Sequence, residues 1–233
     1  MNPRYSLVVP FFNEAGNVMP LMERAVGVLC ALGGPFEVIL VDDGSTDATE
    51  AEIAGAVARW PECRELRMPG RVGQGSALFA GLHCARGDYI LTMDGDGQND
   101  PADFPALLEP VEAGRLDLAC GWRTGRRGAW WRRAASRAAN LVRRAVLRDG
   151  VHDAGCQIRA MRRGVVRALR PMDFMQAFVP ALAAGAGLRV GERPVRDLPR
   201  ALGRSKYGAA ELWWRPAAAM VRLLAAGRSR PPP

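Results

Sequence analysis

The sequence predicts an α/β fold with a mostly parallel central sheet flanked by helices, and three observations support this. First, the opening 120 residues alternate between short, near-continuously apolar runs and longer segments with helical spacing. Such apolar runs are typical of parallel strands that helices cover on both faces. Second, polar residues directly follow three of these runs. Third, 48% of the 233 residues are hydrophobic, which is enough for a substantial core.

The expected elements of the first half follow from these patterns in chain order. Apolar runs bounded by polar residues predict strands at residues 4–10, 36–42, 64–68, 88–94 and 116–121. Helical spacing predicts the intervening helices at residues 17–32, 46–60, 75–85 and 103–113. Ser45 or Thr46 is the expected N-cap of the second helix, because a hydroxyl there can accept a hydrogen bond from an unpaired backbone N–H.

The second half has a different pattern. We expect a basic helical stretch, a loop with a short strand, a further strand, a loop and a final amphipathic helix, at residues 128–148, 151–160, 188–195, 198–208 and 211–226. The tail at 228–233 is expected to be disordered. No internal repeat and no long linker divides the chain.

Charge is segregated along the chain. Residues 1–120 carry 8 Lys and Arg against 18 Asp and Glu, a net charge of −10. Residues 121–233 carry 24 against 6, a net charge of +18. This pattern suggests a metal site in the acidic half and an anionic partner for the basic half. We expect no nucleic-acid partner, because the acidic half would repel a phosphate backbone and no nucleic-acid motif is present.

Cysteine usage and hydropathy indicate a cytoplasmic protein. The five cysteines are odd in number and scattered, without a CxxC pair, so a disulfide framework or a zinc site is not expected. No secretory signal is recognisable at the start. No apolar run approaches the roughly 20 residues needed to span a bilayer. We therefore expect no transmembrane helix.

The segment MDGDGQNDP, residues 93–101, carries the strongest chemical signal. Asp94 and Asp96 are two positions apart, so on an extended chain that leaves a strand both project to the same side. Their hard carboxylate oxygens suit Mg²⁺ or Mn²⁺, and Gln98 can add a carbonyl oxygen. An EF-hand loop is excluded, because glycine and glutamate are missing from its sixth and twelfth positions. The simplest alternative is a turn made of good turn formers.

Polar residues at three strand-to-helix junctions indicate one shared crevice. In open α/β sheets, ligands bind outside the carboxyl ends of the strands. The side chains expected to meet there are Asn13 and Glu14, Asp42 and Asp43, and Asp94 and Asp96.

Seven motifs occur in order along residues 5–208: VVPFFNEAGN, VDDGSTD, RVGQGSALFAGL, MDGDGQNDP, GWRTGR, DAGCQIRAMRR and PRALGRSKYG. Together they resemble the family 2 inverting glycosyltransferases, in the branch of the polyprenyl-phosphate (dolichol-phosphate) sugar synthases. The resemblance implies a metal-dependent hexosyltransferase with the GT-A nucleotide-diphospho-sugar transferase fold. It implies a GT-A domain at 1–210, with a nucleotide- and metal-binding half at 1–120, an acceptor half at 121–210, and an amphipathic helix at 211–227.

The resemblance also implies a role for each matching residue. The donor, a GDP- or UDP-sugar, would be bound by Pro10, Asn13, Glu14, Asp42, Asp43, Gly73, Asp94, Arg200, Ser205 and Lys206. Mg²⁺ or Mn²⁺ on the diphosphate would be held by Asp94, Asp96 and Gln98. The acceptor phosphate would be bound by Arg123, Ser136 and Arg137. The residues expected to act in catalysis are Asp96, Arg123, Asp153, Arg200 and Lys206.

The implied acceptor is a polyprenyl phosphate such as undecaprenyl or dolichyl phosphate. A phosphate monoester has a second pKa of about 6, so at pH 7 it is largely ionised and needs cations to position it rather than a base. Asp153 is the main candidate base after residue 120; it either orients arginine side chains or acts as a base, and we favour orientation. His83 is expected to be structural, and His152 is a weaker candidate for substrate contact.

The basic stretch at 128–148 fits an anionic membrane surface. Tryptophans would lie at headgroup level and arginines near lipid phosphates. These residues are Trp130, Trp131, Arg132, Arg133, Arg143 and Arg144, and the final helix adds Trp213 and Trp214. Helices packed on the sheet, or a homodimer interface, would give the same pattern. We expect a protein associated peripherally with the inner face of the membrane.

The chain departs from the family pattern at three places. Gln74 stands where relatives often have lysine, Gln176 and Ala177 where they often have His-Arg, and Asp197 and Leu198 where many have a histidine nearby. These departures leave the sugar and the acceptor open. Two alternatives remain: transfer to a hydroxyl of a glycan, protein or small molecule, and a non-catalytic subunit that binds a nucleotide-sugar.

Overall fold

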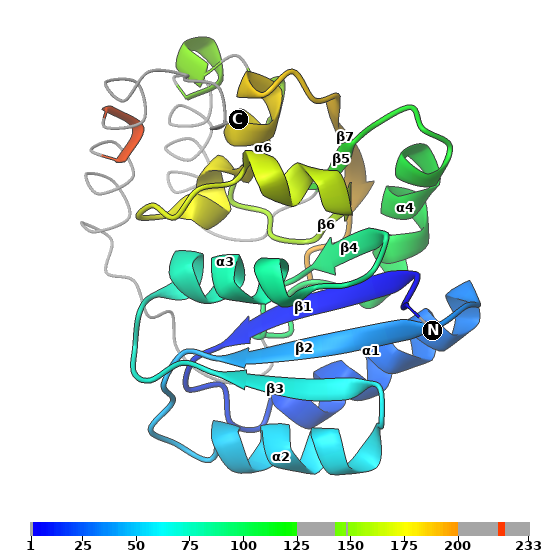
Figure 1. The fold of residues 1–233 in the computed structure, drawn as a ribbon, viewed down its shortest axis with the longest axis vertical. Coiled ribbons are helices and arrows are strands. Elements are labelled where there is room, and N and C mark those ends of the chain that lie inside the picture. The colour runs from blue at the N-terminus through cyan, green and yellow to red at the C-terminus, as the bar shows by residue number, and fades with distance from the viewer. Residues whose placement is uncertain (1, 125–142, 148, 200–218, 222–233) are drawn as a thin grey trace.

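The computed structural model describes residues 2–124, 143–147, 149–199 and 219–221 (Figure 1). Within these ranges a mixed sheet has the strand order β3-β2-β1-β4-β6-β5-β7. The strands are β1 (Tyr5–Phe11), β2 (Phe36–Asp42), β3 (Cys63–Arg67), β4 (Tyr89–Thr92), β5 (Leu118–Arg123), β6 (Arg159–Arg162) and β7 (Val190–Val195). The α/β class and the mostly parallel sheet that the sequence predicts are confirmed.

Helices cover both faces of the sheet (Figure 1). They are α1 (Val18–Leu32), α2 (Thr49–Arg59), α3 (Gln74–Cys84), α4 (Phe104–Glu112) and α6 (Met175–Gly185), with short 3₁₀ turns η1 (Pro101–Asp103) and η2 (Arg163–Ala168). Buried residues of α1, α2 and α4, such as Leu21, Ile53 and Leu107, form one apolar cluster with the sheet. Leu78 of α3 and Met175 of α6 belong to a second cluster on the other face.

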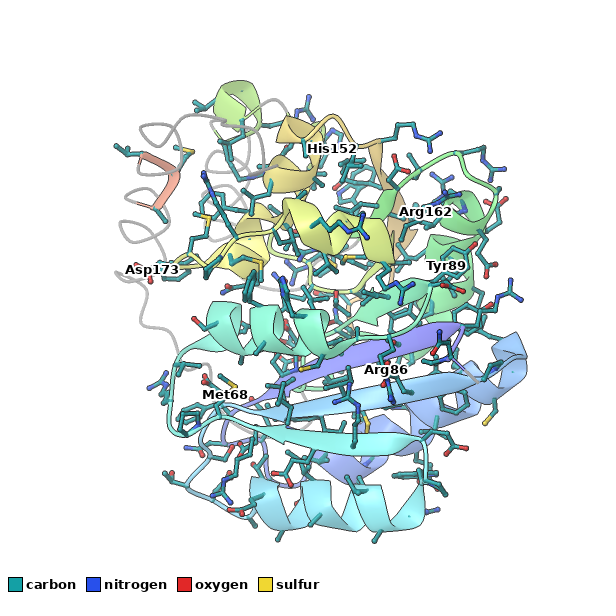
Figure 2. All side chains as sticks on the ribbon, in the orientation of Figure 1. Met68, Arg86, Tyr89, His152, Arg162 and Asp173 are labelled. Carbon is teal, nitrogen blue, oxygen red and sulfur yellow. The ribbon has the colours of Figure 1, made fainter. Side chains whose placement is uncertain are left out.

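The directions of the strands bring their carboxyl ends to a single edge of the sheet. Strand β1 is parallel to β2 and to β4, and β2 is parallel to β3. Strand β6 is antiparallel to both β4 and β5, and β7 is parallel to β5. Tyr89 and Arg162, labelled in Figure 2, are register partners in the β4–β6 pair. Because β6 runs against its neighbours, the loop before it lies at the edge where the other strands end.

The second half differs most from its expected elements. The sequence predicts a short strand inside residues 151–160, whereas β6 spans Arg159–Arg162. Helix α6 and turn η2 were not expected at all. Arg159 is completely buried in β6, and a charged residue at a core position conceals the apolar pattern that identifies a strand. Residues 143–147 and 219–221 are helical, as expected, and the rest of those two predicted helices lies outside the described residues.

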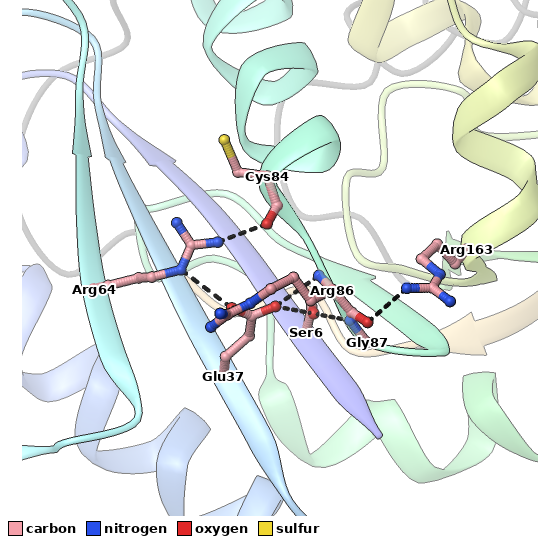
Figure 3. Close-up of polar contacts among 7 residues, drawn as sticks. All are labelled: Ser6, Glu37, Arg64, Cys84, Arg86, Gly87 and Arg163. Atoms are coloured by element: carbon pink, nitrogen blue, oxygen red, sulfur yellow. Dashed lines mark hydrogen bonds and ion pairs between the residues drawn. The ribbon is translucent and has the colours of Figure 1, made fainter. Parts of the chain in front are cut away.

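A buried carboxylate ties together the opposite, amino-terminal edge of the sheet (Figure 3). Glu37 is the second residue of β2 and is 4% exposed. Its Oε1 accepts from Ser6 Oγ and from the Arg86 backbone N–H, both at 2.7 Å. Its Oε2 accepts from Arg64 Nε and Arg86 Nη2, both at 3.1 Å. Burial by itself raises the pKa of Glu37, but the hydrogen bonds from Ser6, Arg86 and Arg64 lower this pKa overall.

We expect Glu37→Gln to lower the free energy of unfolding by about 2 kcal/mol at pH 7, because charge-assisted hydrogen bonds to a buried group are lost. The folded-state pKa of Glu37 is lowered, so its contribution is present above the unfolded value of about 4.3 and is lost as the pH falls through the folded value. The difference between wild type and variant should therefore shrink below about pH 4.5. Urea titrations of both proteins at several pH values measure this difference in the free energy of unfolding.

Glu23→Gln is the matched control, because Glu23 makes an exposed ion pair with Arg59 at 3.1 Å. Exposed pairs contribute little to stability, so this variant should unfold like the wild type at every pH. Equal stability of Glu37→Gln and wild type at pH 7 would show that the Glu37 cluster does not hold this edge of the sheet.

Candidate functional site

The loop after β1 is fastened to the loop after β2. Asn13 has a positive φ of 49° and donates from its backbone N–H to Ser45 Oγ at 3.0 Å. The Thr46 N–H donates to Asn13 Oδ1 at 2.8 Å, and the Glu14 N–H donates to Thr49 Oγ1 at 2.7 Å. The predicted junction residues Asn13 and Glu14 therefore lie beside the end of β2, as a shared crevice requires.

These contacts also explain why the predicted N-cap is wrong. Helix α2 begins at Thr49 after Ala48, and the Thr49 N–H donates to Asp47 Oδ1 at 3.0 Å rather than to Ser45 or Thr46. The Ser45 hydroxyl accepts from Asn13 instead of from its own helix. A contact with the neighbouring loop has replaced the local one, which the local sequence pattern does not encode.

Asp42 and Asp43 are adjacent in sequence but differ in their surroundings. Asp42 ends β2 and is fully buried; its Oδ1 accepts from the Ser45 N–H at 3.0 Å, and its buried Oδ2 has no hydrogen-bond partner among the described residues. A buried acceptor without a partner is costly, so this oxygen suits a ligand that brings an N–H or O–H donor. Asp42 thus has the chemistry of a base- or ribose-binding residue.

Asp43 holds the loop that leads into α3. Its Oδ1 accepts from the backbone N–H groups of Val72 at 2.7 Å and Gly73 at 3.1 Å. Burial raises the pKa of Asp43, although these N–H groups oppose the shift. Gly73 has a φ of 92°, in the left-handed region that favours glycine. Asp43 and Gly73 therefore fix the position of Gln74, the first residue of α3.

The predicted metal-binding loop follows β4 directly. Asp94 Oδ1 accepts from Gln74 Nε2 at 2.6 Å, and the Asp94 N–H donates to Asn99 Oδ1 at 3.1 Å. Asp96 Oδ1 accepts from the Gln98 N–H at 3.1 Å. These bonds hold the two carboxylates on a closed turn at the carboxyl end of the sheet.

Gly95 lets this loop pack directly against the end of β1. A Cβ atom on Gly95 would lie 2.4 Å from Phe11 Cδ1 and 2.9 Å from the Pro10 carbonyl oxygen. Real Cβ atoms do not approach other atoms so closely, so only glycine fits between Asp94 and Asp96. Pro10, which is predicted to line the donor pocket, contributes its backbone carbonyl to this contact.

The donor set fits a divalent cation that a diphosphate also coordinates. Among the described residues, no three histidine, cysteine or acidic side chains form a ready-made metal cluster. An ionised carboxylate has about four lone-pair sites, so a carboxylate that accepts a hydrogen bond can also coordinate a cation. Mg²⁺ commonly binds one or two carboxylates together with substrate phosphates, which this pair can provide. The Gln98 backbone oxygen accepts from the Leu198 N–H at 3.0 Å, so its side-chain oxygen is the better candidate ligand.

The third acid of the segment has a structural role. Asp100 Oδ1 accepts from the Ala102 N–H at 3.1 Å, at the start of η1. Asp100 Oδ2 pairs with Arg196 Nη1 at 3.1 Å, and Asp103 Oδ1 with Arg196 Nε at 3.2 Å. Asn99 also forms an isolated β-bridge with Asp197. This Arg196 clasp joins the acidic loop to the end of β7, just before the loop that carries Arg200.

Arg123 and Asp153 form a buried bidentate pair at the carboxyl end of β5. Arg123 Nε lies 2.8 Å from Asp153 Oδ2, and Nη2 lies 2.9 Å from Oδ1. The side chains are 15% and 7% exposed. Burial favours the neutral guanidinium, but the hydrogen bond and charge of Asp153 raise the pKa of Arg123 overall, so it stays charged. This is the geometry that an orienting role for Asp153 requires.

Glu192 of β7 supports this pair, and the sequence did not reveal it. Glu192 Oε1 accepts from the backbone N–H groups of His152 at 2.8 Å and Asp153 at 3.1 Å. The ring of His152, labelled in Figure 2, stacks on Trp122 with centroids 5.2 Å apart. The sequence did place this glutamate inside a predicted strand, and a buried glutamate needs a hydrogen-bond partner. That is the signal that could have marked Glu192 as part of the site. His83 lies elsewhere, on α3, with Nδ1 3.0 Å from the Phe79 carbonyl oxygen.

Several predicted residues lie outside the described part of the chain: Ser136, Arg137, Arg200, Ser205, Lys206, Trp130, Trp131, Arg132, Arg133, Trp213 and Trp214. Arg143, expected near lipid phosphates, is instead buried; it pairs with Asp149 and donates to the Val151 carbonyl oxygen at 2.6 Å. Asp149, six residues further along the chain, thus binds the guanidinium that was expected to face lipid phosphates. None of the helices within the described ranges is both long enough and apolar enough to cross a membrane.

The sequence is similar to those of known proteins. The profile of the family described as "Glycosyl transferase family 2" matches residues 6–170. Dodecaprenyl-phosphate galacturonate synthase of Rhizobium johnstonii is 40% identical over 207 residues, which cover 87% of this chain and 61% of the relative. Undecaprenyl-phosphate 4-deoxy-4-formamido-L-arabinose transferase of Edwardsiella ictaluri is 35% identical over 209 residues, which cover 89% and 64%. The chain thus spans less than two thirds of the length of these relatives.

Solved structures share the fold. Glucosyl-3-phosphoglycerate synthase of Mycobacterium tuberculosis with Mn²⁺ and UDP-glucose superimposes with a TM-score of 0.70 at 21% identity, covering 96% of this chain and 77% of that one. The same enzyme with Mg²⁺ and UDP gives a TM-score of 0.69 at 20% identity, with the same coverage. The predicted GT-A fold is therefore confirmed.

We expect Gly95→Ala to destabilise the protein by about 2 kcal/mol, because the added methyl group overlaps Phe11 and the Pro10 carbonyl and must push the acidic loop away from β1. Thermal and urea unfolding of the variant and the wild type measure the loss.

Gly55→Ala is the control, because a Cβ atom on Gly55, inside α2, meets nothing within 4 Å. It should stabilise the helix by up to about 1 kcal/mol. If Gly95→Ala were as stable as the wild type, the packing of the acidic loop on β1 would not be a constraint.

Proposed function

Because this chain belongs to the family 2 glycosyltransferases, we propose that it transfers a sugar, with inversion, from a nucleotide-sugar to a polyprenyl phosphate. The proposal is supported by relatives whose names describe transfer to dodecaprenyl and undecaprenyl phosphate. The observation that carries it is the placement of the Asp94–Asp96 loop and the Arg123–Asp153 pair at the same edge of the sheet. The first suits a diphosphate with its cation, and the second suits an anionic acceptor.

In this proposal the donor nucleotide binds across the ends of β1 and β2. The buried Asp42 Oδ2 accepts an N–H from the base of the GDP or UDP moiety. Asn13 and Glu14 form the neighbouring wall, and Asp43 keeps Gly73 and the start of α3 in place. The donor site is thus built from loops that hydrogen bonds hold together before the ligand arrives, which reduces the entropy lost on binding.

The leaving group is a nucleoside diphosphate, whose charge grows as the sugar departs. Asp94 and Asp96, with Gln98, would hold the Mg²⁺ or Mn²⁺, and this cation supplies electrostatic stabilisation of the diphosphate. Arg200, Ser205 and Lys206 are proposed to bind the same diphosphate from the loop that follows the Arg196 clasp. Arginine and lysine donate charge-assisted hydrogen bonds that suit phosphate oxygens.

The acceptor phosphate is proposed to bind Arg123, together with Ser136 and Arg137. The Nε and Nη2 atoms of Arg123 face Asp153, which leaves Nη1 to donate to a phosphate oxygen. Because the phosphate is largely ionised at pH 7, its oxygen attacks the anomeric carbon without a base. Asp153 therefore orients Arg123 rather than removing a proton.

The rest of the proposal concerns the setting of the reaction. A polyprenyl phosphate lies in a bilayer, so the protein is proposed to associate peripherally with the cytoplasmic, anionic face of a membrane. Incubating the protein with Mg²⁺ or Mn²⁺, undecaprenyl phosphate and a panel of nucleotide-sugars, followed by mass spectrometry of the lipids, tests the reaction. Product with a soluble hydroxyl acceptor instead, or donor binding without product, would favour one of the alternative functions.

We expect Asp96→Asn to reduce sugar transfer at least about a hundredfold, because a cation that stabilises the leaving group loses a charged ligand. Chelation with EDTA should reduce wild-type transfer comparably. Initial rates with radiolabelled donor measure both effects. Asp88→Asn is the control, since Asp88 is exposed and lies 3.7 Å from Arg163 in a surface pair. Full activity of Asp96→Asn in EDTA would refute the metal role.

We expect Arg123→Ala to raise the KM for the lipid phosphate about tenfold or more while the KM for the donor changes little, because a charge-assisted contact to the acceptor is lost. Asp153→Asn should have the same signature, since it releases Arg123. If Asp153 were a general base, Asp153→Asn would instead lower kcat with an unchanged acceptor KM. Arg115→Ala, which breaks an exposed pair with Glu109, is the control.

A further inference from the structure

Two glutamines connect the predicted metal-binding loop with helix α6. Gln74 opens α3 and donates from Nε2 to Asp94 Oδ1 at 2.6 Å. Gln176, in the first turn of α6, donates from Nε2 to Gln74 Oε1 at 3.4 Å. The three residues are separated by 20 and 102 positions in sequence, so only the packing of α3 beside α6 and β4 brings them together.

The orientation of both amides follows from Asp94. An ionised carboxylate only accepts hydrogen bonds, so the Gln74 amide must present its Nε2 to Asp94 and its Oε1 to Gln176. Gln176 must then present its own Nε2 to Gln74. The Gln176 Oε1 is left buried, with no hydrogen-bond partner in the part of the chain that the structure describes, 2.7 Å from where a Cβ atom of Gly75 would lie. Gln176 is 7% exposed and therefore confined, and the glycine next to Gln74 leaves it room.

An unsatisfied buried oxygen is costly, so the position of Gln176 requires an explanation. Turning its amide over would bring Oε1 against Gln74 Oε1, and two acceptors would face each other. The arrangement therefore keeps one acceptor unpaired in order to hold Gln74 in the orientation that donates to Asp94. The hydrogen bond from Gln74 to Asp94 is therefore kept, and the Gln176 Oε1 goes without one.

The charge of the donor also matters. A lysine or arginine at position 74 would form an ion pair with Asp94 and compensate its negative charge. The glutamine amide is neutral, so it fixes the carboxylate by a hydrogen bond without contributing positive charge beside a cation. Its short contact and the confinement by Gln176 restrict the rotation of the Asp94 side chain, which lowers the entropy cost of placing the other carboxylate lone pairs on a metal.

We propose that Gln74 is a positioning residue that sets the Asp94 carboxylate for the divalent cation, and that Gln176 acts through Gln74. This inference rests on the proposed function, because it assumes that Asp94 holds a cation. Neither glutamine touches the sugar or the acceptor in this role. The pair instead makes the affinity for the cation depend on α6, an element of the half of the chain assigned to the acceptor.

The first test is Gln74→Met, which keeps the length of the side chain but removes its donor. Binding of Mn²⁺, with UDP or GDP present, is followed by the loss of the free-ion electron paramagnetic resonance signal. A hydrogen bond to a charged group is worth about 1.5–3 kcal/mol, so we expect the dissociation constant for Mn²⁺ to rise at least about tenfold. The melting temperature without metal should fall somewhat, because the buried amide of Gln176 loses the oxygen to which it donates, so Mn²⁺ binding is measured well below the unfolding range.

The second test is a double-mutant cycle with Gln176→Met. This variant should weaken Mn²⁺ binding less than Gln74→Met, because Gln74 can still donate to Asp94 without its support. The double variant should bind Mn²⁺ no more weakly than Gln74→Met alone, since Gln176 acts only through Gln74. Additive losses in the cycle would overturn the relay, because they would mean that the two glutamines act independently.

Arg115→Met is the control. Arg115 precedes β5, at the edge of the sheet opposite the acidic loop, and its exposed side chain pairs with Glu109. Its Mn²⁺ affinity should equal that of the wild type. Unchanged Mn²⁺ affinity in Gln74→Met would overturn the positioning role while leaving the proposed function intact. A wild-type protein that binds no Mn²⁺ with either nucleotide would overturn the metal site and the positioning role together.

Discussion

The candidate site depends on the close approach of the acidic loop to the end of β1, where Gly95 packs on Phe11 and the Pro10 carbonyl. Strand β1 lies between β2 and β4. The contact with β1 therefore determines where the acidic loop lies relative to the loops that follow β1 and β2. The Asn13 loop is in turn bound to the loop after β2, and Asp43 binds the loop before α3. The contact at Gly95 thus sets the position of the proposed metal-binding carboxylates relative to the proposed nucleotide crevice.

The acidic residues of the first half divide into two groups with different roles. One group is bound by the protein: Asp43 by backbone N–H groups, Asp100 and Asp103 by Arg196, and Glu37 by Ser6, Arg64 and Arg86. The other group is Asp42, whose buried Oδ2 has no hydrogen-bond partner among the described residues, and Asp94 and Asp96, which accept from side-chain or backbone N–H groups on the turn after β4. The first group holds the edges of the sheet together, whereas the second has the chemistry of ligand binding.

Some arginines of the basic half form ion pairs within the protein. Arg189 pairs with Asp117 at 3.0 Å, and Arg196 pairs with Asp100 and Asp103, so arginines of the second half bind acids of the first. Arg123 and Arg143 have acids of their own half. The segregation of charge in the sequence therefore serves the contact between the two halves as well as any anionic partner. In the proposed function, Arg123 binds the acceptor phosphate as well as Asp153.

The sequence by itself determined the α/β class, the strands and helices of the first half, and the three polar junctions, because these depend on local periodicity and on residues within a few positions of one another. The seven ordered motifs likewise identified the family that the chain belongs to. Only the tertiary structure decided the partners of the site: Gln74 with Asp94, Arg123 with Asp153, and Glu192 beneath His152. These pairs depend on the order and direction of strands, above all on β6 running against β4 and β5, which delivers the Asp153 loop to the end of β5. The misplaced cap of α2 has the same cause, since the Ser45 hydroxyl accepts from the backbone N–H of Asn13 in a neighbouring loop and not from its own helix.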